Sequence, residues 1–297
     1  MTGAATSISV VHTVADLATY LDPVQAGGLT VGFVPTMGAL HAGHASLIDT
    51  SIASTDLTVV SIFVNPLQFA PGEDLDVYPR DMDGDVALCA AHGAAVVFAP
   101  TIDAIYPKGL PLEGISAGQI SPGPVAQPLE GRERPTHFVG VAEVITRLFA
   151  AVGPCRAFFG EKDFQQLQVV RYLVTDLSMP IEVVGCPTVR EPDGLARSSR
   201  NFHLNDRERA AAPVLYRALQ VAAAAVAEPG WERTTVEATM STMIQAESAG
   251  PLDYAAVVDP LTLRPPENSR PGDELRLLVA CRFGKARLID NLGAVAG

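Results

Sequence analysis

Two histidines lie three residues apart in a segment that follows an apolar run near the start of the chain. The segment is residues 35–44, PTMGALHAGH. If a strand turns into a helix here, His41 and His44 share one face of the first helical turn, at the kind of corner where α/β sheets bind ligands. Imidazoles beside the positive end of a helix could bind phosphate oxygens and stabilise charge that develops when an α-phosphate is attacked.

Two simpler interpretations of this pair stay open. The histidines could be ordinary polar residues at a helix start, or they could form a His-x-x-His metal pair. Zinc is disfavoured because no third ligand of the H-E-x-x-H type follows. Gly38 and Gly43 would let the backbone approach a ligand closely, and together with the strand-to-helix corner they favour a ligand site.

A second polar cluster, GEKDFQQ, occupies residues 160–166 and follows another apolar run. Charged residues directly after a buried strand fit a site at the carboxyl edge of a sheet. Lys162 could hold a phosphate, Asp163 could bind a ribose hydroxyl, and Gln166 could reach the same pocket. The alternative is a capped helix without a site, in which Asp163 favours the helix N-terminus.

Three further groups could bind an anionic substrate. Asn65 and Gln68 follow an apolar run and could orient a hydroxyl or a carboxylate. Arg134 and His137 end a Pro- and Gly-rich stretch, where an arginine suits an anionic group, although solvated charge is its more usual role. Residues 197–201, RSSRN, could close on phosphates, although such segments are common on surfaces.

Composition and missing motifs exclude several classes of protein. The chain has 297 residues, of which 48% are hydrophobic and 18% charged, so it is globular rather than disordered. Its longest apolar stretches are far shorter than the ~20 residues of a membrane-spanning helix. The motif G-x-x-x-x-G-K-[ST] is absent, which excludes a phosphate-loop NTPase, and the absence of G-x-G-x-x-G disfavours a dinucleotide site.

Charge and cysteine usage indicate the cellular setting. A net charge of −12 disfavours nucleic acid and membrane surfaces as partners, while a few local cations could still bind a small anion. The four cysteines are widely spaced and are expected to be reduced core residues. No basic residue precedes the first apolar stretch, which argues against a signal peptide and for a cytoplasmic protein.

Short β-branched runs alternate with helical patterns through the first 190 residues. This alternation predicts an α/β fold with a Rossmann-like, doubly wound parallel sheet. Strands are expected at residues 30–35, 58–64, 94–99, 156–159 and 181–184. Helices are expected from just after Gly43 and over residues 81–91, 138–152 and 163–177.

The pattern changes after about residue 190 and predicts a smaller C-terminal α+β domain. Helices are expected over residues 206–227 and 235–249, followed by strands at 253–258, 274–281 and 285–290. The domains would therefore be residues 1–187 and 188–297. The Pro- and Gly-rich residues 107–135 are expected to form a long surface loop, which in a compact domain is often functional or mobile.

The motifs resemble those of pantothenate synthetase (pantoate–β-alanine ligase) over nearly the whole chain, from about Val31 to Asp290. The matching blocks, in order, are PTMGALHAGH, SIFVNPLQF, DVYPR, LEG followed by RPTHF, FFGEKDFQQ and SSRN. The wider relatives are the HIGH-motif nucleotidyl transferases. His41 to His44 resembles the HIGH signature, and residues 198–200 lie where the KMSKS-like loop would be.

The resemblance implies a two-step reaction. The pantoate carboxylate attacks the α-phosphate of Mg·ATP, giving a pantoyl adenylate and pyrophosphate, and β-alanine then displaces AMP to give pantothenate. It also implies Mg²⁺, a homodimer and a place in coenzyme A biosynthesis. Residues 1–187 would bind ATP and pantoate, and residues 188–297 would form a lid.

The resemblance also implies roles for individual residues. ATP would be bound by Met37, Gly38, His41, His44, Gly160, Glu161, Lys162, Asp163, Val189, Arg197, Ser198, Ser199 and Arg200. Pantoate and β-alanine would be bound by Pro35, Met37, Asn65, Gln68, Arg134, His137 and Gln166. Catalysis is expected of His41, His44, Lys162, Ser198, Ser199 and Arg200. Asp85 would lie near the magnesium ion.

Four positions depart from the family pattern. Arg197 stands where an apolar residue is usual, and Val139, Glu143 and Ile145 change a helix that lines the pantoate pocket in the family. A carboxylate and an added methylene there could change which acid fits. A related adenylate-forming ligase that uses another small acid or amine is therefore the alternative. A nucleotidylyltransferase or a non-catalytic nucleotide-binding protein is a third hypothesis.

Overall fold

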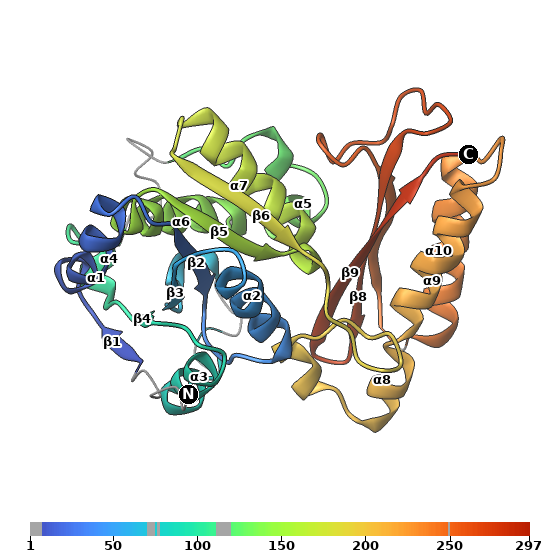
Figure 1. The fold of residues 1–297 in the computed structure, drawn as a ribbon. Coiled ribbons are helices and arrows are strands. Elements are labelled where there is room, and N and C mark those ends of the chain that lie inside the picture. Colours follow the sequence, from blue (N-terminus) through green and yellow to red (C-terminus); the bar gives the residue numbers. More distant parts are fainter. Residues whose placement is uncertain (1–7, 70–74, 76–77, 111–119, 249) are drawn as a thin grey trace, which may run out of the picture. The chain divides into compact units, whose positions relative to one another are not determined.

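The computed structural model describes residues 8–69, 75, 78–110, 120–248 and 250–297 (Figure 1). The chain divides into two compact units. The first comprises Met1–Ala126, Arg134–Glu161 and Gln166–Pro187, and the second comprises Gln127–Glu133, Lys162–Gln165 and Thr188–Gly297. Two short segments that precede residue 188 in the sequence thus belong to the C-terminal unit. Domains divided at residues 187 and 188 stay a prediction.

A six-stranded parallel sheet forms the centre of the first unit, in the order β1-β4-β3-β2-β5-β6 (Figure 1). The predicted doubly wound α/β sheet is confirmed. The order reverses between β2 and β5, because the chain builds outward from β2 on one side and from β5 on the other. The strands are Ser9–Val11 (β1), Val31–Thr36 (β2), Leu57–Ile62 (β3), Val96–Phe98 (β4), Cys155–Gly160 (β5) and Ile181–Cys186 (β6).

Helices cover both faces of this sheet. Phe33 of β2 contacts Phe149 of α6 with ring centroids 6.2 Å apart, whereas the next residue, Val34, packs with Leu47 and Ile48 of α2. Successive side chains of a strand point to opposite faces of the sheet, so one apolar strand packs against helices on both faces. The helices and short turns are Val14–Ala26 (α1), Ala42–Ile52 (α2), Pro66–Gln68 (η1), Met82–Ala91 (α3), Ile102–Ile105 (α4), Pro124–Ala126 (η2), His137–Val152 (α6) and Phe164–Asp176 (α7, whose first two residues belong to the second unit).

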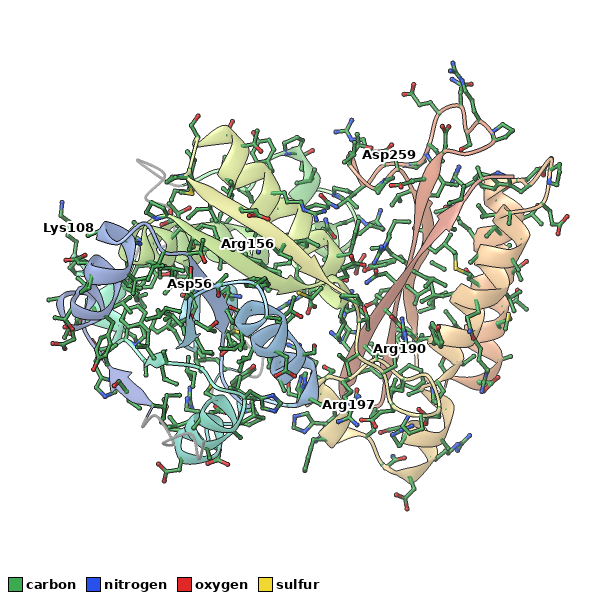
Figure 2. All side chains as sticks on the ribbon, in the orientation of Figure 1. Asp56, Lys108, Arg156, Arg190, Arg197 and Asp259 are labelled. Carbon is green, nitrogen blue, oxygen red and sulfur yellow. The ribbon has the colours of Figure 1, made fainter. Side chains whose placement is uncertain are left out.

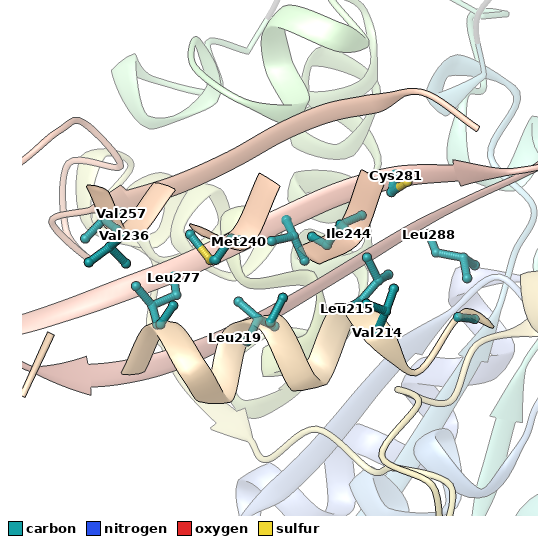
Figure 3. Packing of buried hydrophobic residues seen from close by; sticks show 14 of the residues in the cluster. Val214, Leu215, Leu219, Val236, Met240, Ile244, Val257, Leu277, Cys281 and Leu288 are labelled. Atoms are coloured by element: carbon teal, nitrogen blue, oxygen red, sulfur yellow. The ribbon is translucent and has the colours of Figure 1, made fainter. Parts of the chain in front are cut away.

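The second unit contains a three-stranded antiparallel sheet, β7-β8-β9, with α9 and α10 packed on one face. Alternate residues of β8, among them Leu277, Val279 and Cys281, belong to the buried cluster that these helices cover. Figure 3 labels Leu277 and Cys281 in this cluster. The elements are Glu130–Glu133 (α5), Glu161–Asp163 (η3, of which Glu161 belongs to the first unit), Ser199–His203 (η4), Asp206–Ala211 (α8), Val214–Val226 (α9), Arg233–Glu247 (α10), Leu252–Val258 (β7), Glu274–Phe283 (β8) and Ala286–Val295 (β9).

The other face of this sheet binds the two short segments. Arg287 donates to both carboxylate oxygens of Glu130, at 2.6 and 2.7 Å, and Tyr254 donates to the same carboxylate at 2.7 Å. The guanidinium of Arg276 lies 4.0 Å from the centre of the Phe164 ring. These contacts explain why residues 127–133 and 162–165 pack with strands that lie more than a hundred residues later in the chain.

The structure corrects one expected element. A single helix over residues 206–227 is wrong, because α8 ends at Ala211 and α9 begins at Val214. Pro213 lies in the break; it has no N–H to donate and its ring clashes with the preceding helical turn. The strand β1 was not expected from the sequence, since three residues are too few to show a pattern.

Three further expectations concern the cysteines, membrane-spanning helices and the long loop. All four cysteines are free and buried, which confirms them as reduced core residues. No helix among the described residues is both long and apolar enough to cross a membrane. The stretch expected to form a long loop contains η2 and α5, and its residues 111–119 lie outside the described part of the chain.

Candidate active site

The polar segments singled out in the sequence follow neighbouring strands of the first unit. β2 pairs with β3 on one side and β5 on the other, and all three strands are parallel. Their carboxyl ends therefore share one edge of the sheet. Pro35 and Met37 lie at the end of β2, Asn65 follows β3, and Gly160 ends β5. The order of the strands reverses between β2 and β5, which is the place where open α/β sheets bind ligands.

The two histidines cap the helix α2 reciprocally. His41 is the N-cap residue, and its Nδ1 accepts the backbone N–H of Gly43 at 3.1 Å. His44 lies in the first turn, and its Nδ1 accepts the backbone N–H of His41 at 3.3 Å. The ring centroids are 4.2 Å apart. The side chains thus satisfy N–H groups that the start of a helix leaves without partners.

This arrangement settles which ring nitrogen carries the proton in the neutral imidazoles. A nitrogen that accepts a hydrogen bond has no hydrogen, so both rings carry theirs on Nε2. Each Nε2–H is a donor that can bind an oxygen of an anion. Two such donors beside the positive N-terminus of α2 can stabilise negative charge that develops on a phosphate.

Asp85 fixes the turn that leads from β2 to the histidines. Its carboxylate is buried and accepts the backbone N–H of Ala39 at 2.9 Å and that of Leu40 at 2.7 Å. The turn needs this support, because Gly38 and Ala39 have φ values of +85° and +52°. Burial raises the pKa of Asp85, and the two hydrogen bonds oppose that shift.

Replacing Asp85 by asparagine should destabilise this turn. The amide nitrogen of asparagine is a donor and would face one of the two backbone N–H groups, leaving that group unsatisfied. We expect the free energy of unfolding, measured with urea, to fall by about 1–3 kcal/mol. Asp83→Asn is the matched control, since Asp83 lies exposed in the first turn of the same helix. Equal losses in the two variants would contradict the assignment.

The residues expected to bind the acid gather around η1. Asn65 and Gln68 are buried, and Asn65 Nδ2 donates to Gln68 Oε1 at 3.2 Å. The backbone carbonyl of Gln68 accepts from His137 Nδ1 at 3.0 Å and from Arg134 Nη2 at 3.4 Å. A carbonyl cannot donate, so His137 carries a hydrogen on Nδ1. The structure therefore brings these four residues together, and Gln166 lies half-buried near the start of α7.

The cluster that follows β5 divides between the two units. Gly160 and Glu161 belong to the first, and Lys162 and Asp163 belong to the second. The Lys162 ammonium lies 3.5 Å from the Asp163 carboxylate. The backbone carbonyl of Lys162 accepts a hydrogen bond of 2.8 Å from Asn291 Nδ2. The sheet of the second unit thus holds the backbone of Lys162 in place.

The Ser/Arg segment of the second unit follows a short hairpin, where Figure 2 labels Arg190 and Arg197. Arg190 donates to both oxygens of Asp290, at 2.6 and 3.0 Å. The N–H of Arg197 donates to the carbonyl of Val189 at 2.9 Å. Ser198 caps η4, with its Oγ accepting the N–H of Arg200 at 3.3 Å. Ser199 and Arg200 form the first turn of η4.

The described residues contain no group of three or more His, Cys, Asp or Glu side chains that could hold a metal ion. Both oxygens of Asp85 already accept backbone N–H groups. A contact between Asp85 and magnesium stays a prediction.

A family model described as pantoate-beta-alanine ligase matches residues 9–293. The chain belongs to this family. The expected resemblance is confirmed, and it extends over nearly all of the sequence.

Individual relatives agree with this membership. The chain is 49% identical over 263 residues to the bifunctional pantoate ligase/cytidylate kinase of Synechococcus elongatus. The matched residues are 89% of this chain and about half (49%) of that protein. Pantothenate synthetase from Thermus thermophilus is 47% identical with a TM-score of 0.86, covering 96% of this chain and 99% of that one. Pantoate-beta-alanine ligase from Francisella tularensis, solved in complex with beta-gamma ATP and beta-alanine, is 30% identical with a TM-score of 0.74, covering 96% and 97%.

Three of the departures from the pantoate–β-alanine ligase pattern have contacts within the protein. Glu143 is buried, accepts the backbone N–H of Ile120 at 3.1 Å and pairs with Arg147 at 3.2 Å. Arg197 pairs with Glu191 at 3.1 Å. Ile145 is buried in α6. Both charged departures are therefore paired inside their own unit.

Sequence reasoning missed the residues that position the site. Tyr106 donates to Asn65 Oδ1 at 2.9 Å, and Asn291 and Asp290 of β9 hold Lys162 and Arg190. Polar side chains in an otherwise apolar strand are a weak signal that could have marked Asp290 and Asn291. Nothing local to Tyr106 indicates its role, because its partner lies 41 residues away.

Proposed function

We propose that the chain catalyses the ATP-dependent condensation of pantoate with β-alanine. In the first step a pantoate carboxylate oxygen attacks the α-phosphorus of ATP, and the bond to pyrophosphate breaks, giving pantoyl adenylate. In the second step the amine of β-alanine attacks the acyl carbon, the bond to AMP breaks and the nitrogen loses a proton. The products are pantothenate, AMP and pyrophosphate. Membership of the family supports this reaction.

The histidine cap of α2 is the observation that carries the proposal. His41 and His44 accept backbone N–H groups through Nδ1, so their Nε2–H groups are donors at the start of a helix. The attack on phosphorus increases negative charge on the phosphate oxygens. Donors fixed before the reaction stabilise that charge without having to reorganise.

The acid would be bound around Gln68. The side-chain amide of Gln68 can hydrogen-bond a carboxylate or hydroxyl oxygen, and Arg134 adds positive charge in the same group of residues. Met37 and Pro35 at the end of β2, and Gln166 in α7, are proposed to complete the binding of pantoate and β-alanine. His137 would act by holding the backbone of Gln68.

The second unit would supply cations and hydroxyls for the triphosphate. Lys162, Ser198, Ser199 and Arg200 are proposed to bind phosphate oxygens. Arg197, which precedes Ser198 in the chain, is held by Glu191. The adenosine would contact Gly160, Glu161, Asp163 and the backbone of Val189. Magnesium would enter as Mg·ATP, coordinated mainly by phosphate oxygens. A homodimer in the cytoplasm is proposed on the same family basis.

The first test is pyrophosphate release with Mg·ATP and D-pantoate, with and without β-alanine. We expect about one equivalent per enzyme without β-alanine and multiple turnovers, with AMP, when β-alanine is present. Pantoate labelled with ¹⁸O in its carboxylate should transfer one ¹⁸O to AMP, because the acyl C–O bond breaks in the second step. Absence of pyrophosphate, or AMP without label, would reject the proposed route.

The same assay tests the alternative functions. A ligase for another acid would release pyrophosphate with that acid and not with pantoate. A nucleotidylyltransferase would retain AMP in its product, and a binding protein would bind ATP without turnover. Glu143 pairs with Arg147 and Arg197 pairs with Glu191, so neither charge requires a partner on a substrate.

A further inference from the structure

The side-chain amide of Asn65 has two backbone partners that settle its orientation. Asn65 is fully buried. Its Oδ1 accepts the N–H of Leu67 at 3.4 Å, and its Nδ2 donates to the carbonyl of Gly140 at 3.0 Å. A backbone N–H can only donate and a carbonyl can only accept, so oxygen and nitrogen cannot be exchanged. A side chain at position 140 would overlap the Leu67 carbonyl, which shows how closely α6 approaches η1.

The orientation of Asn65 dictates that of Gln68. The second hydrogen of Asn65 Nδ2 points to Gln68 at 3.2 Å, so the atom that Gln68 turns toward Asn65 must be its oxygen, Oε1. The Nε2 amide group of Gln68 is then the part of the side chain left to bind a ligand. It can donate two hydrogen bonds and accept none. Gln68 therefore selects a hydrogen-bond acceptor.

Tyr106 supplies the remaining partner of Asn65. Its hydroxyl donates to Asn65 Oδ1 at 2.9 Å, a shorter bond than that from Leu67. Tyr106 is 1% exposed, and burial raises the pKa of its hydroxyl, which keeps the proton and the donor role at neutral pH. This hydroxyl occupies the second acceptor position of Oδ1, so all four hydrogen-bonding positions of Asn65 are used inside the protein.

Arg147, which is paired with Glu143, contacts the ring of Tyr106. The guanidinium of Arg147 lies 5.0 Å from the centre of the ring, a cation–π distance. Arg147 is held by Glu143, one turn earlier in α6, at 3.2 Å. The other oxygen of Glu143 accepts the N–H of Ile120 at 3.1 Å. Glu143, which stood out in the sequence, is thus linked to Asn65 through Arg147 and Tyr106.

We propose that Tyr106 is a positioning residue for the acid site, which acts through Asn65 to present the Nε2–H donors of Gln68 to the acid. The inference rests on the proposed function, in which Gln68 binds pantoate. It implies that Gln68 binds an oxygen of the acid that accepts a hydrogen bond, either a carboxylate oxygen or the oxygen of a hydroxyl group. It also predicts that an acid analogue with an N–H donor in that place is rejected.

Tyr106→Phe tests the role directly, since it removes the hydroxyl and keeps the ring beneath Arg147. We expect the KM for pantoate to rise roughly tenfold, because one hydrogen bond to a buried amide is lost. The KM for ATP should change less than twofold. Tyr20→Phe, on the exposed surface of α1, is the matched control and should match wild type. An unchanged KM for pantoate, or an equal rise in both KM values, would overturn the inference.

A double-mutant cycle shows whether Tyr106 acts through Gln68. Gln68→Ala should itself raise the KM for pantoate, and adding Tyr106→Phe should then raise it no further. Residues that act on the substrate independently would give additive changes, whereas residues in one hydrogen-bonded chain do not. Additive effects would show that Tyr106 acts by another route and would overturn the inference.

The variant Gln68→Glu tests whether the Nε2–H groups of Gln68 face the acid. The glutamate can still accept from Asn65, but it places a second oxygen where Nε2 was. If Nε2–H meets an acceptor on the acid, the KM for pantoate should rise further than in Gln68→Ala. A KM near the wild-type value would mean that the site needs an acceptor there, and would overturn the inference. Wild-type enzyme that releases no pyrophosphate with pantoate would instead reject the proposed function, and this inference with it.

Discussion

Replacing His44 by alanine is expected to lower the rate of pyrophosphate formation from ATP and pantoate by at least about 100-fold. His44 Nδ1 accepts the N–H of His41, so its Nε2–H is the donor we assign to a phosphate oxygen. Alanine removes that donor, and the charge that develops in the transition state loses a fixed partner. Single-turnover measurements at saturating ATP and pantoate check this, because they report the adenylation step alone.

The variant His44→Asn separates catalysis from helix capping. The side-chain oxygen of asparagine is close enough to the backbone to accept the N–H of His41, but the residue has no group at the position of Nε2. We expect a melting temperature near that of wild type and a rate as low as that of the alanine variant. Near-normal rates in both variants would contradict the assigned role.

Lys162→Ala is expected to cause a second loss of about 100-fold in the same single-turnover rate. The ammonium group would stabilise phosphate oxygens, and alanine cannot replace it. The change should leave folding nearly unaffected for two reasons. Asn291 binds the backbone carbonyl of Lys162, which alanine keeps, and the ion pair with Asp163 at 3.5 Å is weak.

Lys285→Ala is the matched control for this loss of charge. Lys285 is exposed in the turn between β8 and β9 of the same unit, so its removal changes the net charge equally without touching a proposed site. We expect a rate within twofold of wild type. If Lys162→Ala and Lys285→Ala reduce the rate alike, the effect comes from the overall charge and not from a contact of Lys162.

Local patterns were enough to predict the sheet and the strand-to-helix corner that holds the two histidines. Buried parallel strands appear in a sequence as short apolar runs bounded by Gly and Pro, and five of the six strands of the first unit were found in this way. The spacing of His41 and His44 placed them on one helical turn, because a helix repeats every 3.6 residues. Both features depend on neighbours in the sequence.

Local patterns did not show the contacts that join distant residues. Glu143 stood out as a departure that could change which acid fits, and the structure shows its carboxylate bound to Arg147 and to the N–H of Ile120. The spacing of Glu143 and Arg147 is visible in the sequence, since residues four apart pair on a helix. The bond to Ile120 is not, because no pattern indicates which backbone N–H a buried carboxylate will meet.

The sequence by itself determined the fold class, the strand-to-helix corner with its two histidines, and the family to which the chain belongs. Only the tertiary structure decided the polarity of Gln68 and the residues that hold it, and showed that Asn291 binds the backbone of Lys162. The physical reason is the range of the interactions. Periodicity and capping act over a few residues, whereas the direction of a buried amide depends on every donor and acceptor that folding brings around it.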